Sequence, residues 1–307
     1  MFTSAINTSI TQTELDRVFY QSFGVDAGPG QASAATGDLF KVINTDHRNI
    51  IEEVYKGVGL YDSISEVQNV PLEAPRVTNK LTTEVVDFAK AIEISKNLFD
   101  DNMFNVWQRS VADMGRKARI TMDDNAFKVF RNAFTTQLTA DGVSAINAAH
   151  PLIGGGVESN LVTGALTEAN LNSAFTRMRQ MKDQAGVVLG DMPSILLVPT
   201  PLFKTAVEIT QSALISGSAQ NDVNIYRSAY GLTVYTSPYL DAVTGGSDTA
   251  WYILSPNHSV QRLVRQGIQT FLRDWGYSNN RTYLYQANFR EEAFITDYAG
   301  LVGSTGL

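Results

Sequence analysis

Residues 86–118, VDFAKAIEISKNLFDDNMFNVWQRSVADMGRKA, join two kinds of hydrophobic periodicity with no proline between them. Alternate apolar side chains over the first ten residues predict a β-strand, and the spacing then changes to that of a helix. Proline is absent from about 100 to 137, so we expect one helix over this range, with a length of about 50 Å. Its buried stripe is predicted to contain Phe104, Trp107, Val111 and Met114,.

The strand-like alternation begins farther upstream, near Tyr61, and a proline-containing stretch divides it into two halves. The returning half ends at Ser95 and is regular, whereas the outgoing half, Ser63–Leu72, is more polar. We therefore predict a β-hairpin from about Tyr61 to Ser95 with its tip at Pro71–Lys80,. A long hairpin and a long helix pack poorly as an isolated globule, which indicates a subunit that packs against neighbours. Two strands within an ordinary compact sheet are the alternative, and usual sheet sizes favour it.

The composition of the chain excludes several classes of protein. Its 307 residues are 44% hydrophobic, which is enough for a sizeable core,. The net charge of −7 argues against sequence-independent binding to nucleic-acid phosphates, because such binding depends on Lys and Arg,. With no cysteine, the chain has no disulfide and no thiolate metal ligand,. We expect no membrane span, because no apolar run approaches the roughly 20 residues that cross a bilayer, and no secretory signal pattern at the N-terminus.

Local patterns also predict the regions on either side of the hairpin and helix. Residues 1–45 form an arm, with a helix at Thr13–Phe23 and a Gly-rich linker at 24–37, and we expect the arm to need an outside surface to order it,. Shorter elements over 146–254 are typical of a mixed α/β module. Beyond it, alternation between 265 and 290 predicts antiparallel strands with a turn at Tyr277–Asn280,. The apolar face of the arm helix consists of Leu15, Val18, Phe19 and Phe23.

The sequence contains one weak candidate for a catalytic or metal site. Asp141, His150 and Glu158 could converge as an oxygen-rich metal site or an acid/base group,. The alternative, which we favour, is a turn at His150 whose imidazole satisfies backbone groups. The triple glycine at 154–156 lacks the Gly-Lys-Ser/Thr of a phosphate loop and is followed by an acid,. We therefore assign no catalytic, cofactor-binding or metal-binding residue, and we expect no enzymatic activity and no cofactor.

A series of short motifs runs through the second half of the chain. They are DG at 141–142, AAHPLIGGG at 148–156, MRQMKD at 178–183, PSILLVPT at 193–200 and AWY at 250–252, followed by the stretch 283–304. In this order and spacing, which cover most of residues 92–304, they resemble the major head subunit of Mu-like tailed phages and prophages. The resemblance implies an α+β fold, the tailed-phage major capsid fold of the Hong Kong ninety-seven type.

The resemblance also implies how the chain is divided. Residues 1–45 correspond to the N-terminal arm, 62–91 to an extended E-loop hairpin, and about 100–137 to the spine helix. Residues 146–254 correspond to the mixed α/β axial domain, whereas the C-terminal tail, 291–307, is left unassigned. The peripheral domain, which includes the spine helix, would consist of 46–61, 92–145 and 255–290.

A structural role follows from the same resemblance. We expect a major capsid subunit that self-assembles as hexamers and pentamers into an icosahedral or elongated virion head, built in the host cytoplasm. The head would enclose double-stranded DNA without sequence-specific binding, and the implied partners are a separate scaffolding protein, a portal and an optional decoration protein, with no membrane. An encapsulin-like compartment shell is the alternative, and a metal-dependent enzyme near Asp141 and His150 is a remote one. The E-loop tip would contact neighbouring subunits through Pro71, Glu73, Pro75, Arg76 and Lys80.

Overall fold

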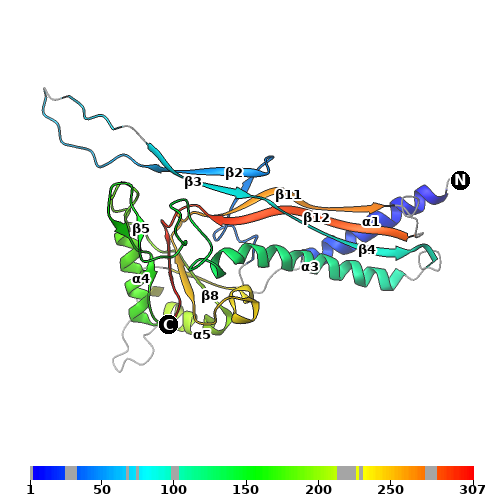
Figure 1. Cartoon of the computed structure of the whole chain (residues 1–307). Coiled ribbons are helices and arrows are strands. Elements are labelled where there is room, and N and C mark those ends of the chain that lie inside the picture. The colour runs from blue at the N-terminus through cyan, green and yellow to red at the C-terminus, as the bar shows by residue number, and fades with distance from the viewer. Residues whose placement is uncertain are drawn as a thin grey trace.

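A computed structural model describes residues 3–24, 33–66, 69–73, 76–97, 104–212, 226–227, 231–273 and 282–307. They form an elongated molecule, in which a long helix and a long sheet extend from a second, more compact lobe (Figure 1). Within these ranges, no helix is both long and apolar enough to cross a membrane. The α-helices are α1 (Thr3–Phe23), α3 (Phe104–Arg131), α4 (Glu168–Gln180) and α5 (Phe203–Gln211). The strands are β1 (Lys41–Asn44), β2 (Asn49–Lys56), β3 (Arg76–Glu84), β4 (Val86–Ser95), β5 (His150–Pro151), β6 (Val157–Glu158), β7 (Leu161–Val162), β8 (Ile195–Val198), β9 (Thr233–Thr236), β10 (Trp251–Leu254), β11 (Val260–Arg273), β12 (Thr282–Ile295) and β13 (Leu301–Ser304).

The first sheet has four strands in the order β1-β11-β12-β4. β1 runs parallel to β11, and the other neighbours are antiparallel. β11 and β12 cover 14 residues each, so the strands expected between 265 and 290 are confirmed and extend beyond both limits. The turn expected between them, at 277–280, lies outside the described residues. Every second side chain of β12 faces the helices α1 and α3 and is buried. These side chains are Tyr283, Tyr285, Ala287 and Phe289.

α3 is the long helix that the sequence predicts, and it covers one face of the first sheet. It ends at Arg131 rather than near 137, because the chain tightens into hydrogen-bonded turns over residues 132–137. The expected start at 100 falls within 98–103, which lie outside the described residues. Phe104 begins α3, but its side chain is also outside the description. The remaining members of the expected stripe are buried against β12 and α1, and they are Trp107, Val111 and Met114.

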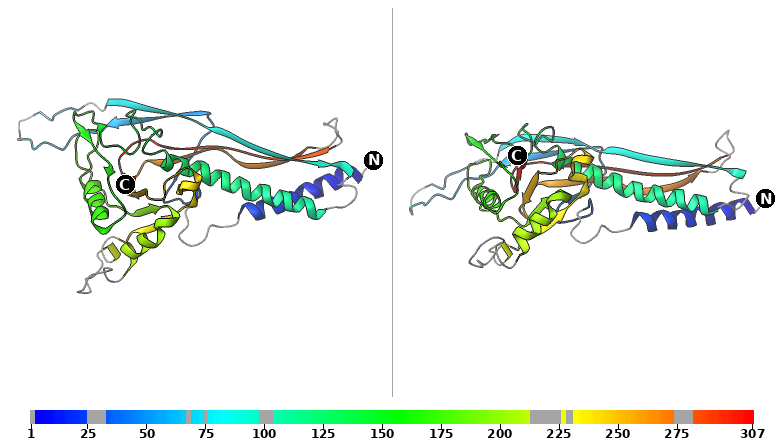
Figure 2. Two further views of the ribbon diagram at one scale, coloured as in Figure 1. Left: turned by 60° about the horizontal axis from the view of Figure 1, so that its bottom comes forward. Right: turned by 90° about the horizontal axis from the view of Figure 1, so that it is seen from below.

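The helix of the arm packs on its own subunit. α1 starts ten residues before the predicted helix, at Thr3 instead of Thr13, and lies alongside α3 in both views of Figure 2. The expectation that the arm needs an outside surface is therefore wrong for α1, since α3 and β12 of the same chain bury its apolar face. In that face Leu15 and Phe19 are buried, and Val18 and Phe23 are partly buried.

The two helices approach each other closely at Gly115. A Cβ atom at this position would lie 2.5 Å from the carbonyl oxygen of Phe19, so only glycine allows the observed distance between the helices. A second contact fixes α1 against the sheet. Oδ1 of Asp16 accepts hydrogen bonds from the hydroxyls of Thr270 and Tyr285, each at 2.8 Å.

The projecting hairpin pairs different strands from those expected. β2 pairs antiparallel with β3, and the described residues between them, 57–66 and 69–73, contain no strand. The expected outgoing strand at Ser63–Leu72 is therefore wrong. β4, the expected returning strand, pairs with β12 instead and forms the edge of the first sheet. There its side chains pack on those of β12, and the rings of Phe88 and Phe289 stack with 4.9 Å between their centroids. The hairpin thus spans 49–84 rather than 62–91.

The second lobe contains a five-stranded sheet in the order β7-β13-β10-β8-β9. Its three inner strands, β13, β10 and β8, are buried along their whole length, as expected for short apolar runs in a sheet covered on both faces. One face packs on α4 and α5, and the other packs on the C-terminal half of α3. The tail at 291–307 is divided between the lobes: residues 291–295 complete β12, and 301–304 form β13 in the second sheet.

Candidate subunit interface

The ribbon of β2 and β3 projects from the molecule and carries a long loop, which the structure describes over residues 57–66 and 69–73 and which is called the loop 57–73 below (Figure 1). A small core holds the base of the ribbon, where Val85, Leu263 and Phe294 pack together. Farther out, Nζ of Lys80 lies 2.7 Å from Oε1 of Glu53 on the neighbouring strand. Their hydrogen bond lowers the pKa of Glu53 and raises the pKa of Lys80. Because this pair faces solvent, it contributes little to stability,.

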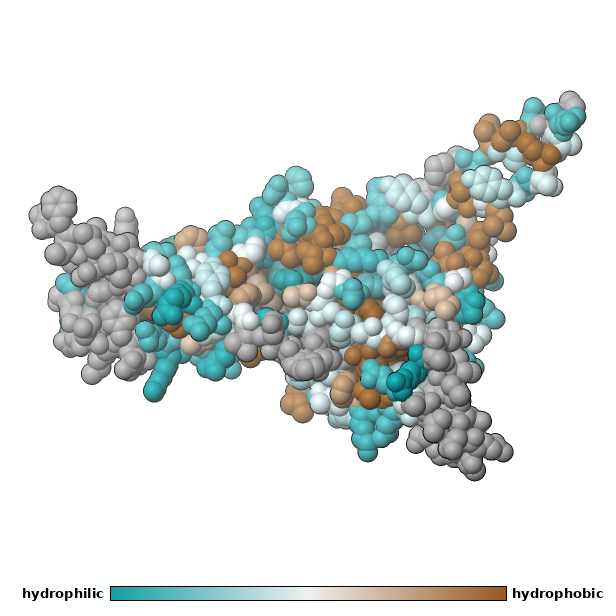
Figure 3. Space-filling model, turned by 180° about the vertical axis from the view of Figure 1, so that it is seen from behind, coloured by the Kyte–Doolittle hydropathy of each residue, from teal (hydrophilic) through white to brown (hydrophobic). Residues whose placement is uncertain are grey.

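Large apolar side chains are exposed along the loop. Leu60 is 78% exposed, Leu72 is 96% exposed, and Tyr61 is fully exposed. Figure 3 shows the resulting apolar surface on the protruding loop. One hydrogen bond crosses the loop, from the backbone N–H of Gly59 to Oε2 of Glu73 at 2.6 Å. Full burial of one such side chain is worth about 1.5–3 kcal/mol, and an exposed apolar cluster on a projecting element is typical of an interaction surface.

The predicted tip residues fall at different places in the ribbon. Pro71 and Glu73 are exposed in the loop. Lys80 lies within β3 and pairs with Glu53, so it is not at the tip. Arg76 begins β3, but its side chain, like all of Pro75, lies outside the described residues. The sequence interpretation missed the exposed apolar residues of the loop, although Val58, Leu60, Tyr61, Val70 and Leu72 are unusual in a proline-containing segment without strand periodicity.

The candidate metal or acid/base cluster is a buried structural contact. Nδ1 of His150 lies 2.6 Å from Oδ2 of Asp141, and Nε2 lies 3.1 Å from Oδ1 of Asn160. The imidazole is fully buried and stacks on Tyr298 with 4.5 Å between ring centroids. Glu158 does not join them: its backbone pairs with His150, and its Oε1 accepts from the N–H of Ser159. Across the described residues, no group of three or more His, Cys, Asp or Glu side chains could hold a metal ion.

These contacts differ in detail from the favoured turn interpretation. The imidazole binds side chains rather than backbone groups, and Asn160 in turn holds the backbone, with its Nδ2 donating to the carbonyl of Ala145 at 2.7 Å. Burial raises the pKa of Asp141, but hydrogen bonds from His150, Thr139 and the N–H of Val143 outweigh it and leave the pKa below its usual value. The cluster therefore ties the 139–160 segment together.

Comparison with known proteins identifies the family. A family model described as phage capsid protein matches residues 78–303. The chain belongs to the phage capsid protein family. The expected resemblance to tailed-phage head subunits is thereby confirmed, and this capsid protein is a structural subunit of a virion shell. Among curated proteins, no sequence matches it.

Solved structures share the fold of this capsid protein at low sequence identity. The mature capsid of bacteriophage PhiM1 matches with a TM-score of 0.57 and 13% identity, over 91% of this chain and 89% of that one. The capsid of cyanophage P-SCSP1u matches with a TM-score of 0.57 and 12% identity, over 91% and 90%. A virus-like particle from Pyrococcus furiosus matches with a TM-score of 0.54 and 9% identity, over 95% and 98%. The expected tailed-phage major capsid fold is confirmed.

Buried charges fix the end of the arm to the body of the capsid protein. Ala34 donates its N–H to Oδ1 of Asp123 on α3 at 2.7 Å, and its carbonyl accepts from Arg262 on β11 at 3.1 Å. Arg262 also binds Oε2 of Glu291 at 2.5 Å. Burial raises the pKa of Asp123 and of Glu291, although the neighbouring guanidinium groups oppose the shift. The described part of the arm after α1, which begins at residue 33, is thus also held by its own subunit.

Proposed function

We propose that this chain is the repeating subunit of a closed head, in which copies form hexamers and pentamers around double-stranded DNA. The loop 57–73 supports this proposal most strongly, because its large apolar side chains project beyond the body of the subunit (Figures 1 and 3). A contact between the loop of one copy and the body of the next is heterologous, so it repeats from copy to copy until a ring closes. Hexamers and pentamers together close an icosahedral or elongated shell.

The charge of the chain is consistent with DNA that is enclosed without sequence-specific binding. The net charge of −7 disfavours tight binding of the subunit to the DNA backbone,. DNA can then move along the inner wall while the head fills. The proposal includes a separate scaffolding protein, a portal and a decoration protein as partners, and assembly in the host cytoplasm. These partners follow from the resemblance to tailed-phage head subunits.

Sedimentation and negative-stain electron microscopy of the expressed protein, alone and with its scaffold, test the proposal. We expect closed shells that sediment far faster than the monomer. A stable monomer or dimer under every condition would contradict the proposed assembly.

A loop variant links assembly to the apolar side chains. Replacing Leu60, Tyr61 and Leu72 together by serine should leave the subunit folded, because these side chains contact little of their own chain, but should abolish shells. The matched control is Val243→Ser, which alters a residue that is 96% exposed in the second lobe and should assemble like the wild type. Normal shells from the loop variant would refute the role given to the loop.

An encapsulin-like compartment shell is the second candidate, because the virus-like particle from Pyrococcus furiosus shares the fold. The family match over residues 78–303 favours the phage head. The two functions differ in what the particle contains. Particles purified from phage-producing cells should hold nuclease-protected DNA, whereas a compartment shell would hold protein cargo.

A further inference from the structure

His258 lies where the two lobes of the subunit join. It belongs to the connection 255–259, which leads from β10 in the second sheet to β11 in the first. A second crossing, residues 296–300, leads from β12 to β13, and the N–H of Ser255 donates to the carbonyl oxygen of Gly300 at 2.9 Å. The side chain of His258 is buried between these segments, with 1% of its surface exposed. Histidine is the side chain that most readily changes its charge near neutral pH, so its state at this junction matters.

The hydrogen bonds of the ring determine its protonation state. Nε2 lies 2.9 Å from the carbonyl oxygen of Asp38, which can only accept, so Nε2 carries a hydrogen,. Nδ1 accepts the backbone N–H of Val260 at 3.2 Å, so Nδ1 carries none,. The imidazole is therefore neutral in this structure. A proton added to Nδ1 would point at the N–H of Val260 and would break that contact.

The surroundings of the ring also favour its neutral form. Burial lowers the pKa of His258, the contact with the carbonyl of Asp38 opposes this shift, and the positive charge of Lys41 adds to it. Nζ of Lys41, on β1, donates to the carbonyl oxygen of His258 at 2.5 Å, which keeps the ammonium group near the ring. The titratable groups on the segments around this junction are Asp38, Lys41, Asp191, Tyr235 and Asp297.

His258 attaches the end of the arm to the connection between the lobes. Its ring binds Asp38, and its backbone carbonyl binds Lys41 three residues later in the arm segment. Between these two contacts, Phe40 is fully buried and packs edge-on against Phe127 and Phe130 of α3. Loss of the ring contacts would therefore leave the arm anchored at Phe40 and would free only the residues next to His258.

We propose that His258 is an acid-sensitive clamp between the arm and the junction of the two lobes. The neutral ring holds Asp38 and Val260 in place. When the ring gains a proton, it loses its accepting nitrogen and brings a second positive charge near Lys41, so residues 36–38 and 255–260 open locally. The two lobes are then less firmly held relative to each other. The clamp acts within one subunit and goes beyond the proposed function, since it does not depend on the assembly of a shell.

The direction of the pH dependence follows from the lowered pKa of His258. Its stabilising contribution is fully present above the ordinary histidine pKa of about 6.5, and it is lost as the pH falls from there through the folded-state pKa. Acid also protonates other buried groups, because burial raises the pKa of Asp123, Glu291, Glu292 and Asp297. The test therefore compares the wild type with a variant at the same pH.

His258→Asn is a suitable variant, because its amide oxygen can accept the N–H of Val260 and does not titrate. Amide hydrogen exchange of the unassembled subunit, measured by mass spectrometry and corrected for intrinsic rates, reports local opening. Between about pH 7.5 and about pH 5, exchange in 36–41 and 255–264 should become several times faster in the wild type. The variant should show no such rise. His47→Asn, at an exposed histidine, is the matched control and should respond to acid like the wild type.

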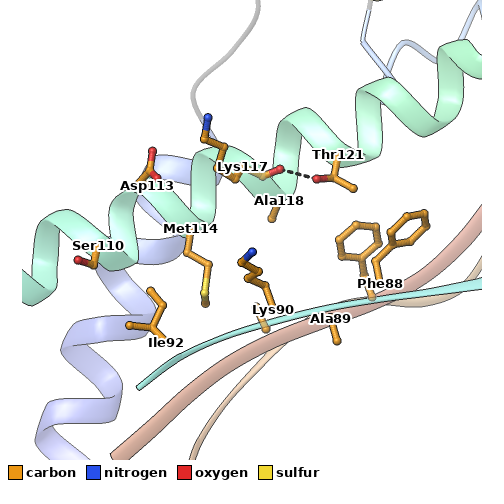
Figure 4. Close-up of a pocket in the computed structure, with 12 residues that line it drawn as sticks. Phe88, Ala89, Lys90, Ile92, Ser110, Asp113, Met114, Lys117, Ala118 and Thr121 are labelled. Atoms are coloured by element: carbon orange, nitrogen blue, oxygen red, sulfur yellow. Dashed lines mark hydrogen bonds between the residues drawn. The ribbon is translucent and has the colours of Figure 1, made fainter. Parts of the chain in front are cut away.

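A reference segment separates local opening from general unfolding. Residues 110–121 of α3 form one wall of an apolar groove, where Met114 points toward β4 (Figure 4). This segment contains no histidine and packs on α1 and β12, so its exchange should be equal in the wild type and in His258→Asn at each pH. Equal acid responses of the two proteins at 255–264, or a rise at 110–121 as large as that at 255–264, would overturn the proposal.

Nuclear magnetic resonance measures the state of the ring directly in the wild type, so it decides the question even if His258→Asn does not fold. The chain has three histidines, and ¹⁵N labelling of their imidazoles distinguishes the two neutral tautomers from the charged form. At about pH 7.5, His258 should be neutral with its hydrogen on Nε2, and it should become charged over the pH range in which 255–264 loses protection. A charged ring or a hydrogen on Nδ1 at about pH 7.5 would refute the clamp, as would protonation without loss of protection.

Discussion

Because α1 and α3 approach each other closely at Gly115, we expect a larger side chain at this position to destabilise the subunit. The same substitution would stabilise an isolated helix. Alanine is preferred over glycine in a helix interior by about 1 kcal/mol, and leucine is nearly as good a helix former. In this structure, however, a Cβ at residue 115 would lie 2.5 Å from the carbonyl oxygen of Phe19, whereas ordinary contacts begin at 3.4 Å. Because the obstructing atoms belong to the backbone of α1, the whole helix must move away.

The size of the effect follows from what α1 buries. Alanine requires a displacement of about 1 Å, which forfeits a quarter to a half of each dispersion contact along the helix pair, so the gain in helix propensity is largely lost. Leucine leaves no room for α1. The buried side chains of Leu15 and Phe19 then become exposed, at about 1.5–3 kcal/mol each,. We therefore expect Gly115→Leu to lower the free energy of unfolding by about 3–6 kcal/mol.

Urea unfolding of the unassembled subunit measures this loss, and limited proteolysis shows whether α1 has detached. Arg116→Leu is the matched control, because it introduces the same side chain one residue away at an exposed position. If Gly115→Leu and Arg116→Leu unfold at the same urea concentration and resist protease equally, α1 does not pack on α3 as described, and the reasoning fails.

Three further substitutions test buried polar groups in the same unfolding assay. His150→Ala should cost about 3 kcal/mol or more, because it removes the buried imidazole that lies 2.6 Å from Oδ2 of Asp141 and leaves that oxygen buried without the contact,. Tyr252→Phe should cost about 1 kcal/mol, since the hydroxyl donates to the carbonyl of Phe130 at 2.9 Å near the end of α3,. Burial raises the pKa of Glu292, so its stabilising contribution is present at low pH and is lost as the pH rises through the folded-state pKa. Lowering the pH from about 8 to about 5 should therefore stabilise the wild type more than Glu292→Gln.

Each of these outcomes has its own control. His47→Ala alters an exposed histidine and should change the free energy of unfolding little; equal effects at His47 and His150 would contradict the buried contact. Tyr55→Phe serves in the same way for Tyr252, because Tyr55 is exposed. For Glu292, identical pH dependence in the wild type and the glutamine variant would show that this carboxyl does not titrate between the two conditions.

The sequence predicts a helix or strand well when the residues of that segment alone show its periodicity. The stripe through Trp107, Val111 and Met114 needs only the helical repeat, and the alternation of β12 needs only the period of two. The pairing of β4 could not be predicted in this way. Its alternation fits a hairpin and a central sheet equally well, and the partner is decided by β12, which lies almost 200 residues later in the chain. α1 begins at Thr3, ten residues before the helix that the apolar stripe predicts.

The sequence predicted a loop at the candidate interface, but it did not predict which residues of that loop are exposed. Prolines and mixed charge correctly indicated a loop around Pro71. The residues chosen were charged or proline, whereas the structure exposes Leu60, Tyr61 and Leu72. Sequence alone does not separate an apolar residue that enters a core from one that projects into solvent, because exposure depends on where the ribbon points. The role of Gly115 could not be predicted either, because it depends on the position of Phe19 on α1.

The place of β13 has a consequence for how the chain folds during its synthesis. β13 lies between β7 and β10 in the second sheet, yet it follows every other strand of that sheet along the chain. The ribosome therefore releases β7, β8, β9 and β10 before the strand that joins β7 to the others. Until then the edges of β7 and β10 that pair with β13 have no partner strand in this sheet, while the projecting loop has already emerged. The order of translation thus delays the closed form of the subunit, and each copy completes its fold only after its apolar loop is exposed to other chains.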